Sequence, residues 1–287
     1  MLAQLQDRFG SKIKALEIFS VMHGIKPAAR IMVDQAELGE TQKWCKENSL
    51  AAIASDFKVR KQDAWKQDAP SKYPAAYSDK GAKIPKDSRE EGYFFLYLAK
   101  EPGKAEEAKL LEQDGKHKEL GILLGYPECC SAFFEKHFPE QSKHSNDFTL
   151  LTLGNSSGFQ FPWPMNICAR HFDISLLSHF PCSFQCAHSL EIAKRNCSLL
   201  SEHDINLAGQ FESDMKAAVI YTDTQGVVLL KNPNFEGSRL IYDGIKATQD
   251  NQLSNFLRSA ESITIETKGR IVINGLKFTN LGLMVFF

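Results

Sequence analysis

The spacing of apolar residues changes along the chain, and each spacing predicts a different kind of element. Between Leu5 and Leu16 apolar residues recur at helical intervals, which predicts a helix over residues 1–24. Strand-like apolar runs and a helical pattern then alternate, in the order 28–33 (strand), 36–48 (helix) and 51–59 (strand). This alternation predicts a small α/β lobe over residues 1–60.

The next part of the chain changes from polar to strongly apolar. Lys, Asp, Ser, Pro and Ala dominate residues 61–91, which predicts a long polar loop or a lid. The run Tyr-Phe-Phe-Leu-Tyr-Leu within 92–99 has no polar alternation, so we expect a strand buried on both faces. Mostly helical patterns follow it, and together they predict a central helical module over residues 92–210.

The last part of the chain has a β pattern. Short β-prone segments separated by turn residues lie at 217–222, 226–230, 239–242, 262–267, 270–273 and 283–287. They predict a C-terminal antiparallel part over residues 211–287. With the α/β lobe and the central helical module, this organisation predicts an α+β fold.

Composition adds little to this picture except through cysteine. The 287 residues are 43% hydrophobic and 24% charged, with a net charge of -1, so nothing indicates a nucleic acid or a membrane surface as partner. The N-terminal residues lack the pattern of a signal peptide, and no apolar run could span a bilayer, so we expect a cytoplasmic protein. Seven cysteines in such a chain favour metal binding or catalysis over disulfides.

Four of the cysteines lie in two short stretches, Leu124–Ser131 and His179–Cys186. In the first stretch a proline and a glutamate precede Cys129 and Cys130, which predicts that both thiols lie in the first turn of a helix. In the second stretch Pro181 precedes or opens a helix to about His203, with Cys182 and Cys186 at its start. Because a helix N-terminus favours thiolate, we interpret the two stretches as halves of one site.

The spacing of the cysteines leaves the metal open. Cys182 and Cys186 have the separation of a zinc-binding pair. The adjacent Cys129 and Cys130 point about 100° apart on a helix of roughly 3.6 residues per turn, so we expect them to chelate one ion poorly. An iron–sulfur cube offers separate iron corners, so a 4Fe-4S cluster is favoured over zinc.

The function follows from that choice. If only one of Cys129 and Cys130 binds, an open iron could act as a Lewis acid on a small-molecule substrate, with His179 and Arg170 as catalytic candidates. The reaction would be redox, an elimination or sulfur transfer. The alternatives are a zinc-stapled binding or scaffold module without catalysis, and a dithiol redox protein. Packing in an apolar core is the simplest alternative for the cysteines, and we expect it for Cys197.

The two cysteine stretches also resemble a family of archaeal and bacterial proteins known only as a domain of unknown function. The resemblance covers roughly residues 119–196. The matching residues are Leu124, Gly125, Pro127, Cys129, Cys130, Phe133, Phe134, Asn166, His179, Pro181, Cys182, Cys186 and Ser189. The resemblance implies that the paired motifs form one site, and it implies no particular activity.

Overall fold

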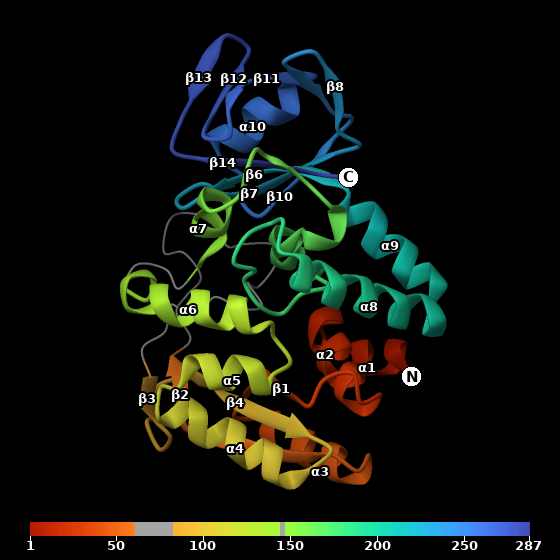
Figure 1. Ribbon diagram of the computed structural model, residues 1–287, viewed down its shortest axis with the longest axis vertical. Helices are drawn as coiled ribbons and strands as arrows, with labels where there is room; N and C mark the ends of the chain where they lie inside the picture. Colours follow the sequence, from red (N-terminus) through yellow and green to blue (C-terminus); the bar gives the residue numbers. More distant parts are fainter. Residues whose placement is uncertain (61–82, 144–146) are drawn as a thin grey trace. The chain divides into compact units, whose positions relative to one another are not determined.

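The computed structural model describes residues 1–60, 83–143 and 147–287 (Figure 1). Its fold is mixed α+β, which confirms the predicted class. The described residues form two compact units, one ending at Asp147 and the other made of Phe148–Phe287. This division falls inside the span 92–210, which the sequence predicts as one module. Most of the predicted polar loop over 61–91 lies outside the described residues.

A four-stranded antiparallel sheet forms the centre of the first unit. Its strands, in spatial order, are β1 (Ala28–Asp34), β4 (Gly92–Ala99), β2 (Ala51–Arg60) and β3 (Lys83–Pro85). The central strand β4 is buried at every residue except Tyr93, which is half-buried. The apolar run predicted to be buried on both faces is therefore confirmed, because β4 has a strand on each side and helices packed against it.

Six helices of the described residues accompany this sheet: three of them pack against it, the other three pack on neighbouring helices, and the last carries the first pair of cysteines. They are α1 (Leu2–Phe9), α2 (Lys12–Met22), α3 (Leu38–Glu47), α4 (Pro102–Gln113), α5 (His117–Leu123) and α6 (Glu128–Gln141). The single helix expected over 1–24 is instead two helices. Gly10 ends α1 in a left-handed conformation at φ 61°, and the Ser11 side chain then caps α2 by accepting from Lys14 N–H.

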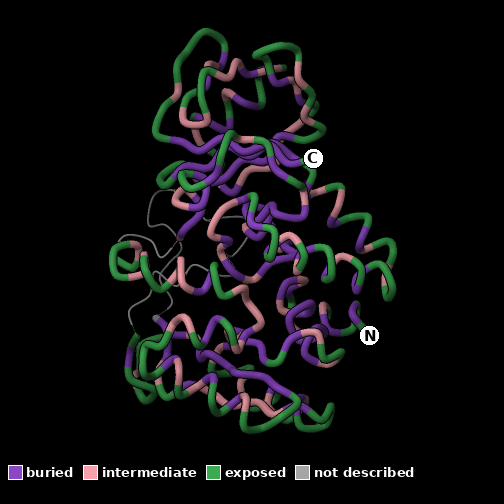
Figure 2. The backbone as a smooth tube through the Cα atoms, viewed as in Figure 1, coloured by how far each residue is buried: buried purple, intermediate pink, exposed green. Residues whose placement is uncertain are grey.

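The second unit contains two five-stranded sheets rather than one small sheet. One has the order β10-β7-β6-β14-β5 and the other β13-β12-β11-β9-β8. The strands are β5 (Gln160–Phe161), β6 (Ala217–Thr222), β7 (Gly226–Lys231), β8 (Asn234–Glu236), β9 (Arg239–Ile241), β10 (Ile245–Ala247), β11 (Ser262–Thr267), β12 (Arg270–Ile273), β13 (Leu276–Phe278) and β14 (Gly282–Phe286). Figure 2 shows that β6, β7 and β14 are buried along almost their whole length.

The second unit's helices are α7 (Thr149–Gly154), α8 (Ala187–His203), α9 (Ile205–Met215), α10 (Gln252–Ser259) and the 3₁₀ turns η1 (Trp163–Met165) and η2 (Ile167–Phe172). The apolar spacing of residues 165–177 also predicts a helix, but this region forms the turns η1 and η2 instead of a continuous helix. Asn166 accepts from Ala169 N–H and donates to Met215 O, while Asp173 is left-handed at φ 60°. In the part of the chain that the structure describes, every helix is too short or too polar to cross a membrane.

His117, the first residue of α5, should make the stability of the first unit depend on pH. Its ring packs on Phe134 and Phe138 of α6, with centroids 5.7 and 4.2 Å away. This burial lowers the pKa of His117 below its usual value of 6.5. The unfolded chain therefore binds a proton that the folded chain rejects, and the free energy of unfolding should fall as pH drops through about 6.5. Urea unfolding between pH 8 and pH 5 measures this decrease.

The variant His117→Phe keeps an aromatic ring at this position and cannot titrate. We expect its unfolding free energy to fall less than that of the wild type over the same pH range. Equal decreases in both proteins would contradict the assignment to His117. Above pH 8 the two curves should run parallel, because the wild-type imidazole is neutral there in both the folded and the unfolded chain.

Candidate metal centre

The first cysteine element is a turn between α5 and α6. Gly125 follows α5 in a left-handed conformation at φ 80°. Its N–H donates to Ile122 O and the N–H of Tyr126 donates to Gly121 O, each at 2.9 Å, which is the Schellman pattern of a helix end. Pro127 then serves as the N-cap of α6, one position earlier than predicted from the sequence. Cys129 and Cys130 lie in the first turn of α6, as the sequence predicts.

Close packing and charge hold the start of α6 against α5. A Cβ placed on Gly121 of α5 would lie 2.5 Å from Ser131 Oγ, so any other residue there would require the Ser131 side chain to shift. Lys118 Nζ lies 2.7 Å from Glu128 Oε1, and this hydrogen bond to the ammonium lowers the pKa of the Glu128 carboxyl. The carboxylate of Glu128 also suits the positive end of the helix dipole. These contacts with α5 help to hold the start of α6, which carries the first two thiols.

The second cysteine element is a turn followed by α8. The sequence predicts that Pro181 precedes or opens a helix with Cys182 and Cys186 at its start, but α8 begins at Ala187, with Cys186 as its N-cap. Ser183 explains the difference. Its carbonyl accepts from Cys186 N–H at 3.0 Å and its hydroxyl accepts from Gln185 N–H at 3.0 Å, which forms a turn instead of a helix. Cys182 therefore precedes the helix, whereas Cys186 marks its start.

Residues 152–157 brace this turn from the end of α7. Thr152 Oγ1 donates to Pro181 O at 2.8 Å, and Asn155 Nδ2 donates to Cys182 O at 2.6 Å. Further along, Ser156 Oγ accepts from Phe184 N–H at 2.8 Å. Ser157 and Gln185 complete the brace with a reciprocal pair of hydrogen bonds. The end of α7 and the residues after it thus hold the backbone that carries Cys182.

Phe184 anchors the same turn in the core. It is fully buried, and its ring centroid lies 4.9 Å from that of Phe161 and 5.5 Å from that of Phe286. Phe161 belongs to β5 and Phe286 to β14, two neighbouring strands. The side chain between Cys182 and Cys186 is therefore packed against the sheet, which restricts where both thiols can lie.

The four cysteines of these elements form a group that could hold a metal ion. The sulfur atoms of Cys129, Cys130, Cys182 and Cys186 all lie within 4.8 Å of one another. Cys130 and Cys186 are buried, Cys182 is half-buried and Cys129 is exposed. Thiolates are soft ligands that bind zinc, copper(I) and iron–sulfur clusters. The remaining cysteines, Cys45, Cys168 and Cys197, lie outside this group.

The distances test which metal the group fits. Four sulfurs at about 2.3 Å from one tetrahedral ion are about 3.8 Å apart. The sulfurs of Cys129 and Cys130 are 3.9 Å apart, so the adjacent cysteines can reach one ion despite their different directions on the helix. In a four-iron cube each thiolate binds a different iron, and the thiolates are roughly 6 Å apart. The zinc and iron–sulfur alternatives therefore differ in the sulfur spacing that they require.

The two predicted catalytic residues lie beside the second cysteine element and have protein partners. Arg170 is buried in η2, where it donates to Thr149 Oγ1 at 2.9 Å and lies 4.1 Å over the Phe180 ring. His179 is buried, with Nε2 2.9 Å from Ser189 Oγ. Both side chains therefore support the segment that leads to Cys182. Their catalytic roles stay predictions.

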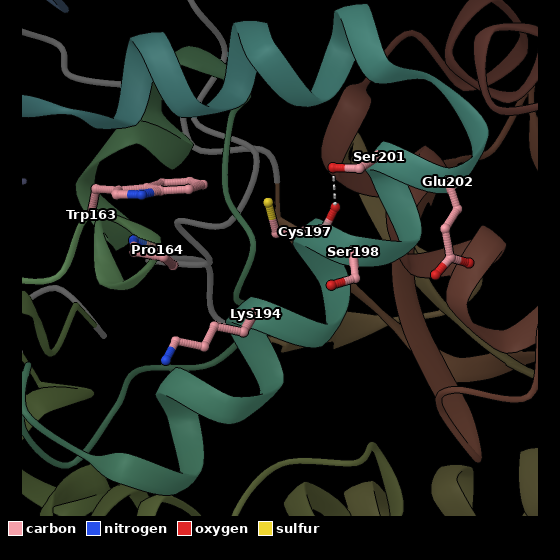
Figure 3. A pocket seen from close by; sticks show the side chains of 7 residues that line it. All are labelled: Trp163, Pro164, Lys194, Cys197, Ser198, Ser201 and Glu202. Atoms are coloured by element: carbon pink, nitrogen blue, oxygen red, sulfur yellow. Dashed lines mark hydrogen bonds between the residues drawn. The ribbon is translucent and has the colours of Figure 1, made fainter.

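The sequence predicts that Cys197 packs in the core, but the structure places it only partly there. It is half-buried and lines a shallow hollow of about 550 Å³ between α8 and η1. Figure 3 shows its thiol beside Trp163, with Lys194 and Ser201 on the same helix. Burial raises the pKa of the Cys197 thiol, and the negative charge of Glu212 adds to this shift. Burial likewise raises the pKa of Cys45 to about 12, so both thiols are protonated at neutral pH.

Comparisons with family models, with curated proteins and with solved structures give no match to this chain.

Proposed function

We propose that the four-cysteine group binds one tetrahedral zinc ion and that the protein is a zinc-stapled binding or scaffold module. The observation that carries this proposal is the 3.9 Å separation of the Cys129 and Cys130 sulfurs, together with the 4.8 Å limit for the group. The first value matches the edge of one zinc tetrahedron, and the second is an upper limit that lies closer to that edge than to the sulfur spacing of a four-iron cube. A site in which all four ligands come from the protein is closed, and closed zinc sites in proteins are structural.

Helix dipoles support an anionic centre at this place. Four thiolates around one divalent ion carry a net charge of about -2. Cys129 and Cys130 lie in the first turn of α6, and Cys186 is the N-cap of α8. A helix N-terminus has a partial positive charge, so both helix starts suit the net negative charge of such a centre. The cytoplasmic location expected from the sequence would keep these thiols reduced and able to bind metal.

A second candidate is an iron–sulfur enzyme, and the exposure of Cys129 favours it. If the exposed Cys129 does not bind, the ligands are Cys130, Cys182 and Cys186. A 4Fe-4S cluster held by three cysteines keeps one iron for a small-molecule substrate and supplies Lewis-acid or redox chemistry there. His179 and Arg170 are the nearest candidates for polar contacts to such a substrate. The sulfurs of the group lie closer together than the thiolates of a four-iron cube, so we place this candidate second to zinc.

Metal analysis of the protein purified without oxygen tests the proposal. We expect a colourless protein with about one zinc ion per chain and no acid-labile sulfide, because one tetrahedral ion uses all four cysteines. A brown protein with iron and sulfide in similar amounts would contradict the zinc site and support the iron–sulfur enzyme. A metal-free protein in which these four thiols react freely would reject both and favour dithiol redox chemistry.

A further inference from the structure

A buried ion pair lies directly behind the first cysteine element. Lys26 Nζ is 2.5 Å from Glu17 Oε2, and the two side chains are only 5% and 7% exposed. Removing two charges from water is costly, and apolar residues of similar size often replace such pairs without loss of stability. A buried pair is therefore weak evidence for stability. The contacts of Lys26 indicate another role for the pair.

Lys26 contacts the turn that leads to the cysteines. Its ammonium lies 4.9 Å from the centroid of the Tyr126 ring, a cation–π contact. A Cβ placed on Gly125 would lie 3.7 Å from Lys26 Cγ and 3.4 Å from Pro27 Cδ, so the turn rests directly on these two residues. Tyr126 is followed by Pro127, the N-cap of α6, and then by the first-turn cysteines. Lys26 thus supports the residues that set the start of α6.

Glu17 and the backbone fix Lys26 in place. The N–H groups of Ile25 and Lys26 both donate to Ser20 O, at 2.9 and 3.2 Å, which ties the segment after α2 to that helix. Glu17 is a buried residue of the same helix, and its carboxylate accepts a hydrogen bond from the Lys26 ammonium. The ammonium therefore has a defined position under the Tyr126 ring.

We propose that Lys26, held by Glu17, is a positioning residue for the metal centre. It fixes the Gly125–Pro127 turn so that Cys129 and Cys130 present their sulfurs at the separation that one tetrahedral ion requires. This inference rests on the proposed metal site. An apolar side chain of equal length could fill the same space, but it would lose the attraction to the aromatic ring and leave Glu17 as an unpaired buried charge.

Cobalt(II) titration of the metal-free full-length chain tests this role, because cobalt in a four-thiolate site has a characteristic visible and charge-transfer spectrum. We expect Lys26→Met and Glu17→Gln to raise the cobalt dissociation constant about 10- to 100-fold, as changes next to metal ligands do, and to alter the spectrum. The matched control is Glu112→Gln. Glu112 is also a buried carboxylate of the first unit, paired with Arg30. Its substitution should leave the affinity and the spectrum unchanged.

Three further variants separate positioning from folding. Tyr126→Leu keeps the ion pair but removes the ring, and it should weaken cobalt binding, whereas Tyr126→Phe should not. The double variant Glu17→Leu with Lys26→Met removes both charges. Its cobalt binding should stay weak, because the cation–π contact to Tyr126 is still absent. Wild-type affinity in the double variant, or in both Lys26→Met and Tyr126→Leu, would overturn the inference while the metal site stands. A wild-type protein that binds no cobalt would instead reject the proposed function.

Discussion

Replacing Cys186 by serine is expected to raise the dissociation constant for zinc more than about 100-fold, since even the loss of a group next to a ligand costs roughly 10- to 100-fold. Cys186 is buried at the N-cap of α8 and belongs to the four-cysteine group. A serine hydroxyl is a harder and more weakly binding ligand than thiolate. Because the ion stabilises only the folded chain, the variant should also unfold at a lower temperature in zinc.

Competition with a coloured chelator measures the affinity, and Cys197→Ser is the matched control. Cys197 lies on the same helix and is also partly buried, but it is outside the group. Its substitution should leave zinc affinity unchanged. If Cys186→Ser binds zinc as tightly as the wild type, Cys186 is not a ligand and the four-thiolate site is wrong.

The variant Cys129→Ser separates the two candidate centres. Cys129 is the exposed member of the group. In a single-ion site it is one of four ligands, and its loss should weaken metal binding strongly. In a cluster held by Cys130, Cys182 and Cys186 it is not a ligand, so iron and sulfide content should not change. Metal analysis of this one variant therefore distinguishes zinc from an iron–sulfur cluster with an open iron.

The sequence predicts those features that depend on neighbouring residues. The run within 92–99 has no polar position, so it could only be a strand covered on both sides, and β4 is one. Pro127 and Glu128 indicate a helix start, and α6 begins there. The placement of Cys129 and Cys130 in a first turn follows from the same local signals, because helix starts depend on capping and charge within a few residues.

Features that depend on distant residues could not be predicted. The brace from Asn155 to Cys182 joins residues 27 apart, and neither side chain has a pattern that identifies the other. The turn before α8 could not be predicted either, because a proline followed by two cysteines four apart also suits a helix start. Two features favour a turn over a helix here. The local hydrogen bonds of Ser183 compete with those of a helix, and Phe184 packs on the sheet.

Phe184→Ala is expected to lower both the stability of the protein and its zinc affinity. The ring is fully buried between Phe161 and Phe286, so its removal leaves a cavity and should lower the free energy of unfolding by about 3–5 kcal/mol. Because Cys182 and Cys186 flank this residue, the loss of the anchor should also let both thiols move. We therefore expect weaker zinc binding as well as lower stability. Urea unfolding of the metal-free protein and chelator competition measure the two effects separately.

Phe211→Ala provides the control that separates these effects. Phe211 is another fully buried phenylalanine of the second unit, located in α9. Its loss should cost a similar free energy of unfolding, since the cavity is of similar size. It should not change zinc affinity in the folded protein, because Phe211 does not lie between two of the four cysteines. Equal zinc affinities in the two folded variants would show that Phe184 supports only the core. A lower affinity in Phe184→Ala alone would mean that the packing of one ring against β5 and β14 sets the position of Cys182 and Cys186.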